Sequence, residues 1–476
     1  MTILPSGTPP QPWSGADAPA PHPYPRQDPP GQPGPTGRPQ RRVNVWRVVW
    51  LTVAIVVMAA SGIGMLLFLG WRMGPVALIV GIGAAVLPVP LLVYCFLWLQ
   101  RYRPAPVWYL VGSFSWGACM ATLVSLVVNT GSSLLLERYH MQEDLVAVLV
   151  APFIEETTKA AGPVVLFWVL FHRRRRTHSG IIDGIVFCGL SATGFAMVEN
   201  ILYIGGLGYA QGVENGGALV GAAGVVKVFF ARIVMAGFAH PLFTLMTGIG
   251  IGIAAREANR VVRWLAPIGG WLVAMMLHGS WNLMSVLVKA TQQAYVMLYG
   301  YVAVMMPIFF CMVGFALWLR SSEGRLTERV LAVYARAGWL SPPELAALGT
   351  LGRRASARRW AKRVAGDPGA RAMRAFQFDA TKLALLRDGL HRGIGTEPAD
   401  LPHTLAEEQR LLGALMGYRT VFTGRDPQVP PARWDGSRYH ITFPDGVVRP
   451  LDQPEQAVVP VPVTFVAQPL VGYPYR

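Results

Sequence analysis

The feature that most constrains this chain is a series of long apolar stretches between Trp46 and Leu319. Eight can be delimited, at residues 46–70, 75–99, 107–130, 146–171, 181–204, 224–254, 264–288 and 295–319. Each holds roughly 20 or more mostly apolar residues, enough for a helix rising about 1.5 Å per residue to cross a bilayer core. Pro88 and Pro90 predict a kink in the second stretch. The sequence therefore predicts an all-α polytopic membrane protein with about eight transmembrane helices.

Composition excludes an ordinary soluble enzyme. Only 14% of the residues are charged and 53% are hydrophobic, whereas soluble domains carry about 25% charged residues. The chain has 42 basic and 26 acidic residues, for a formal net charge of +16. The basic residues form short clusters between the apolar stretches rather than one continuous face. This pattern is typical of loops at an anionic membrane surface, so we expect a lipid bilayer as partner and no nucleic acid.

The loop charges also predict an orientation. One alternating set of connections carries Arg38, Arg41, Arg42, Arg101, Arg103, Arg173 to Arg176, Arg256, Arg260, Arg263 and Arg320, whereas the other carries Arg72, Arg138 and Lys289. Because basic loops stay on the cytoplasmic side, we expect a multi-pass protein of the cell membrane with cytoplasmic N- and C-termini.

The flanking segments differ from this core. Residues 1–42 are rich in proline and poor in aliphatic residues, which predicts a disordered cytoplasmic tail ahead of a transmembrane domain at 43–320. Residues 321–476 contain no further apolar stretch and predict a small, soluble, mixed α/β cytoplasmic region without an assigned function. The local signals there are a capping box at Ser341–Glu344, a helical pattern over 370–392 and a strand-like alternation over 438–443.

Ionisable side chains inside the apolar stretches are costly and few, so each is a candidate functional residue. Away from the ends of the stretches they are Glu155, Glu156 and Lys159 in the fourth, Glu199 beside Asn200 in the fifth, Arg232 and His240 in the sixth, and His278 with Asn282 in the seventh. Spacings of four residues place Glu155 with Lys159, and His278 with Asn282, on common helix faces. The carboxylates and imidazoles fall at similar depths, displaced toward the external side. Such a set suits a buried centre that activates water.

Three classes of function remain open on these residues. Polar pairs can simply hold helices together, as in an inert scaffold whose C-terminal region binds a partner. A buried Glu/His/Lys relay also suits a proton- or cation-coupled transporter, although the stretches show no internal duplication. The first hypothesis is peptide-bond hydrolysis with Glu155 as general base, shared with Glu156, and with Lys159 balancing the charge. Glu199 and His240 would position water or ligate a metal, and His278 with Asn282 would complete the metal site or stabilise an oxyanion.

The same motifs carry a resemblance to a known family. The segments EETTK (155–159), GFAMVENILY (194–203), the His240 segment and HGSWN (278–282) closely resemble the PrsW family of intramembrane proteases over about residues 150–285. The wider superfamily includes the CAAX prenyl endopeptidases and the bacterial CPBP/ABI proteins, and its second motif is Phe-x-x-x-His. Here Phe195 is followed by Glu199, as in the PrsW branch, whereas His278 and Asn282 match the later His-x-x-x-Asn motif directly.

The resemblance implies an intramembrane endopeptidase that cuts a membrane protein, such as an anti-sigma factor, near the outer face of the membrane. The candidate catalytic residues are Glu155, Glu156, Lys159, Glu199, Asn200, His278 and Asn282, and the candidate metal ligands are Glu199, His240 and His278. PrsW proteins are commonly classed as metalloproteases, which favours Zn²⁺. The related CAAX enzymes are described as glutamate-dependent, so a metal-free mechanism is the alternative. The sequence contains no HExxH motif, so separate helices would have to assemble a zinc site.

Overall fold

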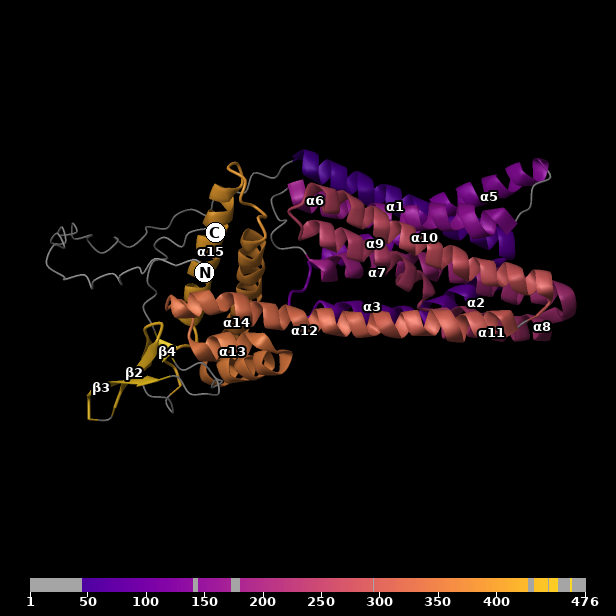
Figure 1. The fold of residues 1–476 in the computed structure, drawn as a ribbon. Helices are drawn as coiled ribbons and strands as arrows, with labels where there is room; N and C mark the ends of the chain where they lie inside the picture. The colour runs from indigo at the N-terminus through magenta and orange to yellow at the C-terminus, as the bar shows by residue number, and fades with distance from the viewer. Residues whose placement is uncertain are drawn as a thin grey trace, which may run out of the picture. The chain divides into compact units, whose positions relative to one another are not determined.

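The computed structural model describes residues 45–139, 144–172, 180–293, 295–426, 432–443, 445–452 and 463–464. The predicted tail at 1–42 and the arginines at 173–176 lie outside these residues. The described chain is helical up to residue 419, and short strands follow near its end (Figure 1). The predicted all-α membrane architecture is thereby confirmed.

The membrane region is a series of helices joined by short connections. They are α1 (Val45–Met73), α2 (Pro75–Val86), α3 (Val89–Leu99), α4 (Val107–Ser115), α5 (Thr122–Arg138), α6 (Ala151–His172), α7 (Ile181–Ile201), α8 (Gln211–Phe229), α9 (Ala239–Ala255), α10 (Arg260–Thr291), α11 (Tyr295–Gly300) and α12 (Met306–Arg336). Wider π-helical turns extend several of them: η1 (Trp116–Ala121), η2 (Val146–Val150), η4 (Leu202–Ala210), η5 (Phe230–Met235) and η6 (Tyr301–Met305). The predicted kink is present, because the helix is interrupted between Val86 and Val89.

Six stretches of the described chain are long and apolar enough to cross a membrane, at Val48–Met73, Pro75–Leu99, Val107–Arg138, Ile181–Ala255, Arg260–Thr291 and Tyr295–Arg336. The stretch Ile181–Ala255 is 75 residues long and contains a break at Gly216 and Gly217, where the backbone leaves helical angles. Helix α6 is not among them, since it carries Glu155, Glu156 and Lys159. The predicted number of eight spans is therefore not confirmed, and the orientation of the termini stays a prediction.

Close packing of α7 against α9 positions the polar residues. Gly184 on α7 faces Gly248 on α9, and a Cβ atom at Gly184 would lie 2.0 Å from the Gly248 carbonyl oxygen. Small residues allow helix backbones to approach this closely in membranes. Helix α10 packs along the other side of α9 (Figure 1). These three helices carry Glu199, His240 and His278, so their packing brings the candidate site together.

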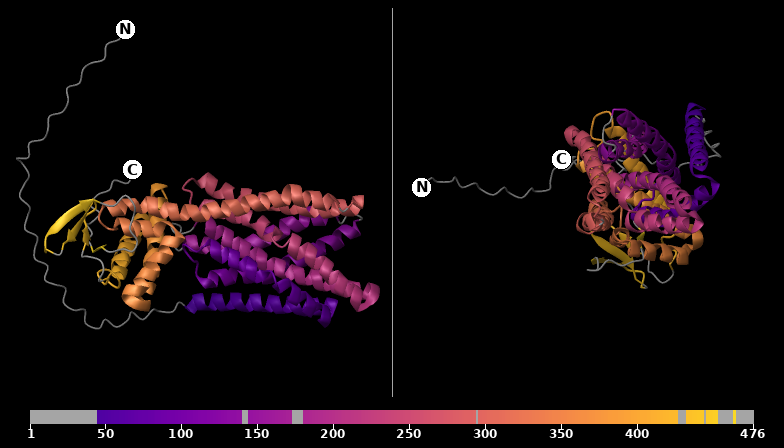
Figure 2. Two further views of the ribbon diagram at one scale, coloured as in Figure 1. Left: turned by 90° about the horizontal axis from the view of Figure 1, so that it is seen from below. Right: turned by 90° about the vertical axis from the view of Figure 1, so that its right-hand side faces the viewer.

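The C-terminal region has its own core. Helix α12 passes through the predicted boundary at residue 320 and extends into this region (Figure 2). It packs with α13 (Pro342–Gly349), α14 (Leu351–His391) and α15 (Leu401–Arg419). Ser341 and Glu344 form the predicted capping box at the start of α13. A sheet in the order β3-β2-β1-β4 follows, built from β1 (Ala432–Trp434), β2 (Arg438–Thr442), β3 (Val448–Asp452) and β4 (Val463–Thr464).

Contacts of two arginines, one half-buried and one buried, join this region to the transmembrane helices. Arg256, directly after α9, pairs with Asp388 on α14. Arg354 on α14 donates to the carbonyl oxygen of Tyr102 at 3.3 Å and lies over the Tyr102 ring. Arg354 is only 2% exposed, and this burial lowers the pKa of its guanidinium to about 10. The C-terminal helices are therefore attached through specific polar contacts as well as through α12.

Candidate active site

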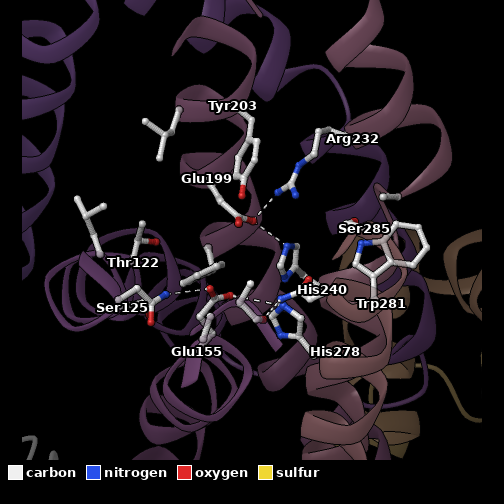
Figure 3. Close-up of a pocket in the computed structure, with 18 of the residues that line it drawn as sticks. Thr122, Ser125, Glu155, Glu199, Tyr203, Arg232, His240, His278, Trp281 and Ser285 are labelled. Carbon is white, nitrogen blue, oxygen red and sulfur yellow. Dashed lines mark hydrogen bonds and ion pairs between the residues drawn. The ribbon is translucent and has the colours of Figure 1, made fainter. Parts of the chain in front are cut away.

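A cavity of about 570 Å³ opens between the membrane helices. Its wall includes residues from α1, α5, α6, α7, α9 and α10, and it contains Glu155, Glu199, His240, His278 and Asn282 of the predicted set. Figure 3 shows Glu155, His240 and His278 directed toward one another, with Glu199 above them and Arg232 beyond it. The structure therefore gathers carboxylates and imidazoles from separate helices around one space.

Lys159 is at the centre of this group. Its side chain is completely buried, and its Nζ lies 3.1 Å from Glu155 Oε2 and 2.9 Å from Glu156 Oε1. The same nitrogen lies 3.0 Å from Nδ1 of His240 and 4.1 Å from the centre of the Phe195 ring. A buried ammonium needs such partners, because isolated charges are unstable away from water. Lys159 therefore neutralises carboxylate charge, as predicted from the spacing of four residues to Glu155.

His240 connects this centre to a second ion pair. It lies at the start of α9, just after the π-helical segment η5, and its Nε2 is 2.7 Å from Glu199 Oε2. Arg232 in η5 donates from Nη2 to the same Glu199 oxygen at 2.5 Å. Because Glu199 contacts both a cation and an imidazole, it can fix the orientation of the His240 ring.

His278 is held from another direction. Its Nδ1 lies 2.9 Å from Glu156 Oε1, and its Nε2 lies 3.8 Å from Glu155 Oε2. The ring stacks on Phe243, with centroids 5.3 Å apart. Glu156, which is fully buried, also accepts a hydrogen bond from the Thr244 hydroxyl at 2.7 Å. Glu156 is thus surrounded by Lys159, His278 and Thr244, whereas Glu155 lines the cavity.

The two asparagines of the predicted set take different places. Asn282 lines the cavity, but its Nδ2 donates to the carbonyl oxygen of Ala147 at 2.8 Å. Asn200 is buried and accepts a hydrogen bond from Arg232 Nε at 3.1 Å. Asn282 therefore ties α10 to η2 and retains one amide hydrogen for another acceptor. Its predicted role as an oxyanion donor stays a prediction.

One set of side chains could hold a metal ion. Donor atoms of Glu155, His240 and His278 all lie within 4.8 Å of one another. Two imidazoles and a carboxylate are ligands that zinc accepts. The other nitrogen of each imidazole faces a carboxylate, Glu199 for His240 and Glu156 for His278, as is usual behind metal-ligating histidines. The donor set fits zinc. It contains Glu155 in place of Glu199, which the sequence analysis named as a candidate ligand. The Lys159 ammonium contacts Glu155 and His240 and so competes with a metal ion for these two donors.

Sequence reasoning left several site residues unassigned. Arg232 was visible as an ionisable residue inside an apolar stretch, but its pairing with Glu199 depends on how η5 packs against α7. Asn129 on α5 donates to Glu155 Oε1 at 3.3 Å, and Tyr203 in η4 lies under the Arg232 guanidinium. Single polar or aromatic residues such as these give no spacing signal, so the sequence offered no means of selecting them.

The comparison with protein families decides the identity of this region. Residues 105–312 match the family model described as PrsW family intramembrane metalloprotease. This part of the chain is a PrsW-family protease domain. The matched range contains all the predicted catalytic residues, from Glu155 to Asn282, so the resemblance inferred from the motifs is confirmed.

Two curated proteins support the PrsW assignment at low identity. Protease PrsW of Clostridioides difficile (strain 630) is 25% identical over 228 residues, which is 46% of this chain and 85% of that protein. Protease PrsW of Oceanobacillus iheyensis is 25% identical over 187 residues, covering 39% of this chain and 74% of that protein. No solved structure matches the chain. The PrsW-family domain is therefore a membrane protease, and the C-terminal region lies outside the family match.

Proposed function

We propose that the chain hydrolyses a peptide bond of a membrane-protein substrate inside this cavity, near the outer face of the membrane. The observation that carries the proposal is the meeting of Glu155, His240 and His278 in the wall of one cavity, each in contact with a further ionisable side chain. An anti-sigma factor is the substrate class that the family resemblance suggests. The alternating loop charges support the outer face, since the polar residues are displaced away from the arginine-rich ends.

Glu155 is suited to the role of general base. It lines the cavity, whereas Glu156 is enclosed by protein, so Glu155 is the carboxylate that water and substrate can reach. Its Oε1 accepts from Asn129 and its Oε2 faces Lys159. A base held in this way takes a proton from water and returns it to the departing amine. Glu156 keeps His278 oriented through the contact to Nδ1.

Zinc is the metal that the donor set fits, with Glu155, His240 and His278 as the residues that would hold it, and in that scheme Glu155 would be a ligand instead of the free base. A zinc ion there would act as a Lewis acid and make water a stronger nucleophile. Glu199 and Glu156 would fix the orientation of the two imidazoles through their outer nitrogens. In the metal-free alternative, Lys159 supplies the positive charge, and Glu155 with the histidines activates water.

A comparison of membrane proteomes tests the proposal. Cells with the wild-type chain are compared with cells carrying Glu155→Gln, which keeps the size of the side chain and removes its basicity. We expect at least one membrane protein to accumulate in its uncut form in the variant, while the variant itself remains inserted and abundant. Lys227→Gln serves as the control, because Lys227 is exposed and does not line the cavity. Identical cleavage products in wild type and Glu155→Gln would refute the assignment of Glu155 as the base.

A further inference from the structure

The Arg232 guanidinium is fixed on several sides and still has hydrogen-bond donors available. Nε donates to Asn200 Oδ1 at 3.1 Å, Nη2 donates to Glu199 Oε2 at 2.5 Å, and the guanidinium carbon lies 4.1 Å from the centre of the Tyr203 ring. Within the described part of the chain, Nη1 has no hydrogen-bond partner and is not a buried atom. The side chain lines the cavity and is 19% exposed. Nη1 is therefore free to donate to a ligand in the cavity.

The charges around the cavity indicate what kind of ligand this donor suits. Three carboxylates, Glu155, Glu156 and Glu199, face two permanent cations, Lys159 and Arg232. With one carboxylate in excess, this balance accommodates a negative charge on a ligand only when one carboxylate takes up a proton. A neutral carbonyl group that becomes negative only during the reaction is favoured, because the proton released at that moment neutralises a carboxylate.

We propose that Nη1 of Arg232 donates to the carbonyl oxygen of the peptide bond that is cut. This inference rests on the proposed function. When the water oxygen bonds to the carbonyl carbon, one water proton passes to Glu155 and the electron pair of the C=O bond moves onto the oxygen facing Arg232. When the C–N bond breaks, that pair re-forms the carbonyl and the amine takes the proton from Glu155. Arg232 thus stabilises charge that exists only between these two steps.

The geometry suits this role, because a donor stabilises a transition state best when it is already in position. The bonds to Glu199 and Asn200 and the Tyr203 ring hold the guanidinium plane before any substrate binds. A planar guanidinium can use two nitrogens for these partners and direct the third elsewhere, whereas a lysine ammonium is a single point on a flexible chain.

The competing explanation is that Arg232 only neutralises Glu199. Arg232→Lys separates the two roles, because a lysine can keep the ion pair with Glu199 but loses the directed Nη1 donor. Lys227→Gln is the matched control. Lys227 lies five residues before Arg232, in helix α8, which continues directly into η5. Lys227 is exposed and does not line the cavity. The double variant Arg232→Gln/Glu199→Gln is a second test that leaves no unpaired charge.

The experiment measures the affinity of the purified full chain in detergent for two probes. One is an end-capped peptide rich in leucine and alanine, and the other is the same peptide with a phosphinate group in place of the central peptide bond, which imitates the tetrahedral oxyanion. We expect wild type and Lys227→Gln to prefer the phosphinate peptide. Arg232→Lys should lose about tenfold or more of that preference while binding the ordinary peptide as before, and the double variant should lose it as well. Removal of one such donor in other enzymes lowers kcat by about 10²–10³.

The possible results separate the two proposals. A wild-type preference that persists in Arg232→Lys and in the double variant would overturn the role of Arg232 and leave the protease proposal intact. A wild-type chain without any preference for the phosphinate peptide would overturn both. Equal weakening of both probes in Arg232→Lys would show that Arg232 only maintains the cavity, and that result would also overturn the inference.

Discussion

The most informative perturbation of the buried network is Lys159→Met. Lys159 is completely buried and its Nζ contacts Glu155 and Glu156 at 3.1 and 2.9 Å. Methionine fills a similar volume but leaves both carboxylates without their nearest cation. Removing one partner of a buried ion pair costs about 3–5 kcal/mol. We expect Lys159→Met to lower the free energy of unfolding by about that amount.

A double-mutant cycle assigns this loss to a particular carboxylate. Glu156 is the more enclosed partner, so Glu156→Gln in the Lys159→Met background removes the unpaired buried charge. The double variant should then be more stable than the sum of the single effects predicts, by a coupling of about 2 kcal/mol. The amide oxygen that Glu156→Gln introduces could still accept the hydrogen bonds that Thr244 and His278 provide.

The assay is reversible unfolding in mixed micelles with increasing sodium dodecyl sulfate, followed by tryptophan fluorescence. Lys289→Met is the control, because its exposed pair with Asp144 is 3.9 Å long and such pairs contribute at most about 1 kcal/mol. Two results would refute the reasoning. One is a loss below about 1 kcal/mol for Lys159→Met, and the other is simple additivity in the double variant.

Three further predictions concern the metal, the topology and the packing. If His278 holds zinc, His278→Ala loses bound metal together with activity, while Asn282→Ala keeps the metal. Metal analysis of the purified wild type and both variants checks this, and an active wild type without metal would contradict it. Reporter fusions should place the C-terminus in the cytoplasm and the 205–223 segment outside, and the opposite result at either position would exclude the predicted orientation. Gly184→Ala should lower stability by about 1–3 kcal/mol in the same unfolding assay, because its Cβ would meet the Gly248 carbonyl oxygen at 2.0 Å, and an unchanged stability would show that α7 and α9 can separate freely.

The helices of this protein could be predicted from the sequence, because the patterns that indicate them involve only residues close together in the chain. The apolar stretches, the kink at Pro88 and the capping box at Ser341 depend on residues within a few positions of one another. The number of spans was harder to obtain. The turn at Gly216 and Gly217 falls inside one continuous apolar stretch, and α6 carries charged residues that reduce its apolar character.

The contacts of the candidate site likewise divide into those that follow from local helical geometry and those that depend on how separate helices pack. Glu155 and Lys159 lie four residues apart on one helix, so their contact follows from helical geometry alone, and the structure contains it. The placement of His240 between Lys159 and Glu199 could not be obtained in this way. Helical geometry alone also could not predict the ion pair between Arg232 and Glu199 or the hydrogen bond from Asn282 to Ala147. Each joins separate helices, so it depends on their relative rotation and depth, which close contacts such as Gly184 against Gly248 decide. The sequence by itself determined which ionisable side chains lie within the membrane helices, and only the packing of those helices decided which of them meet.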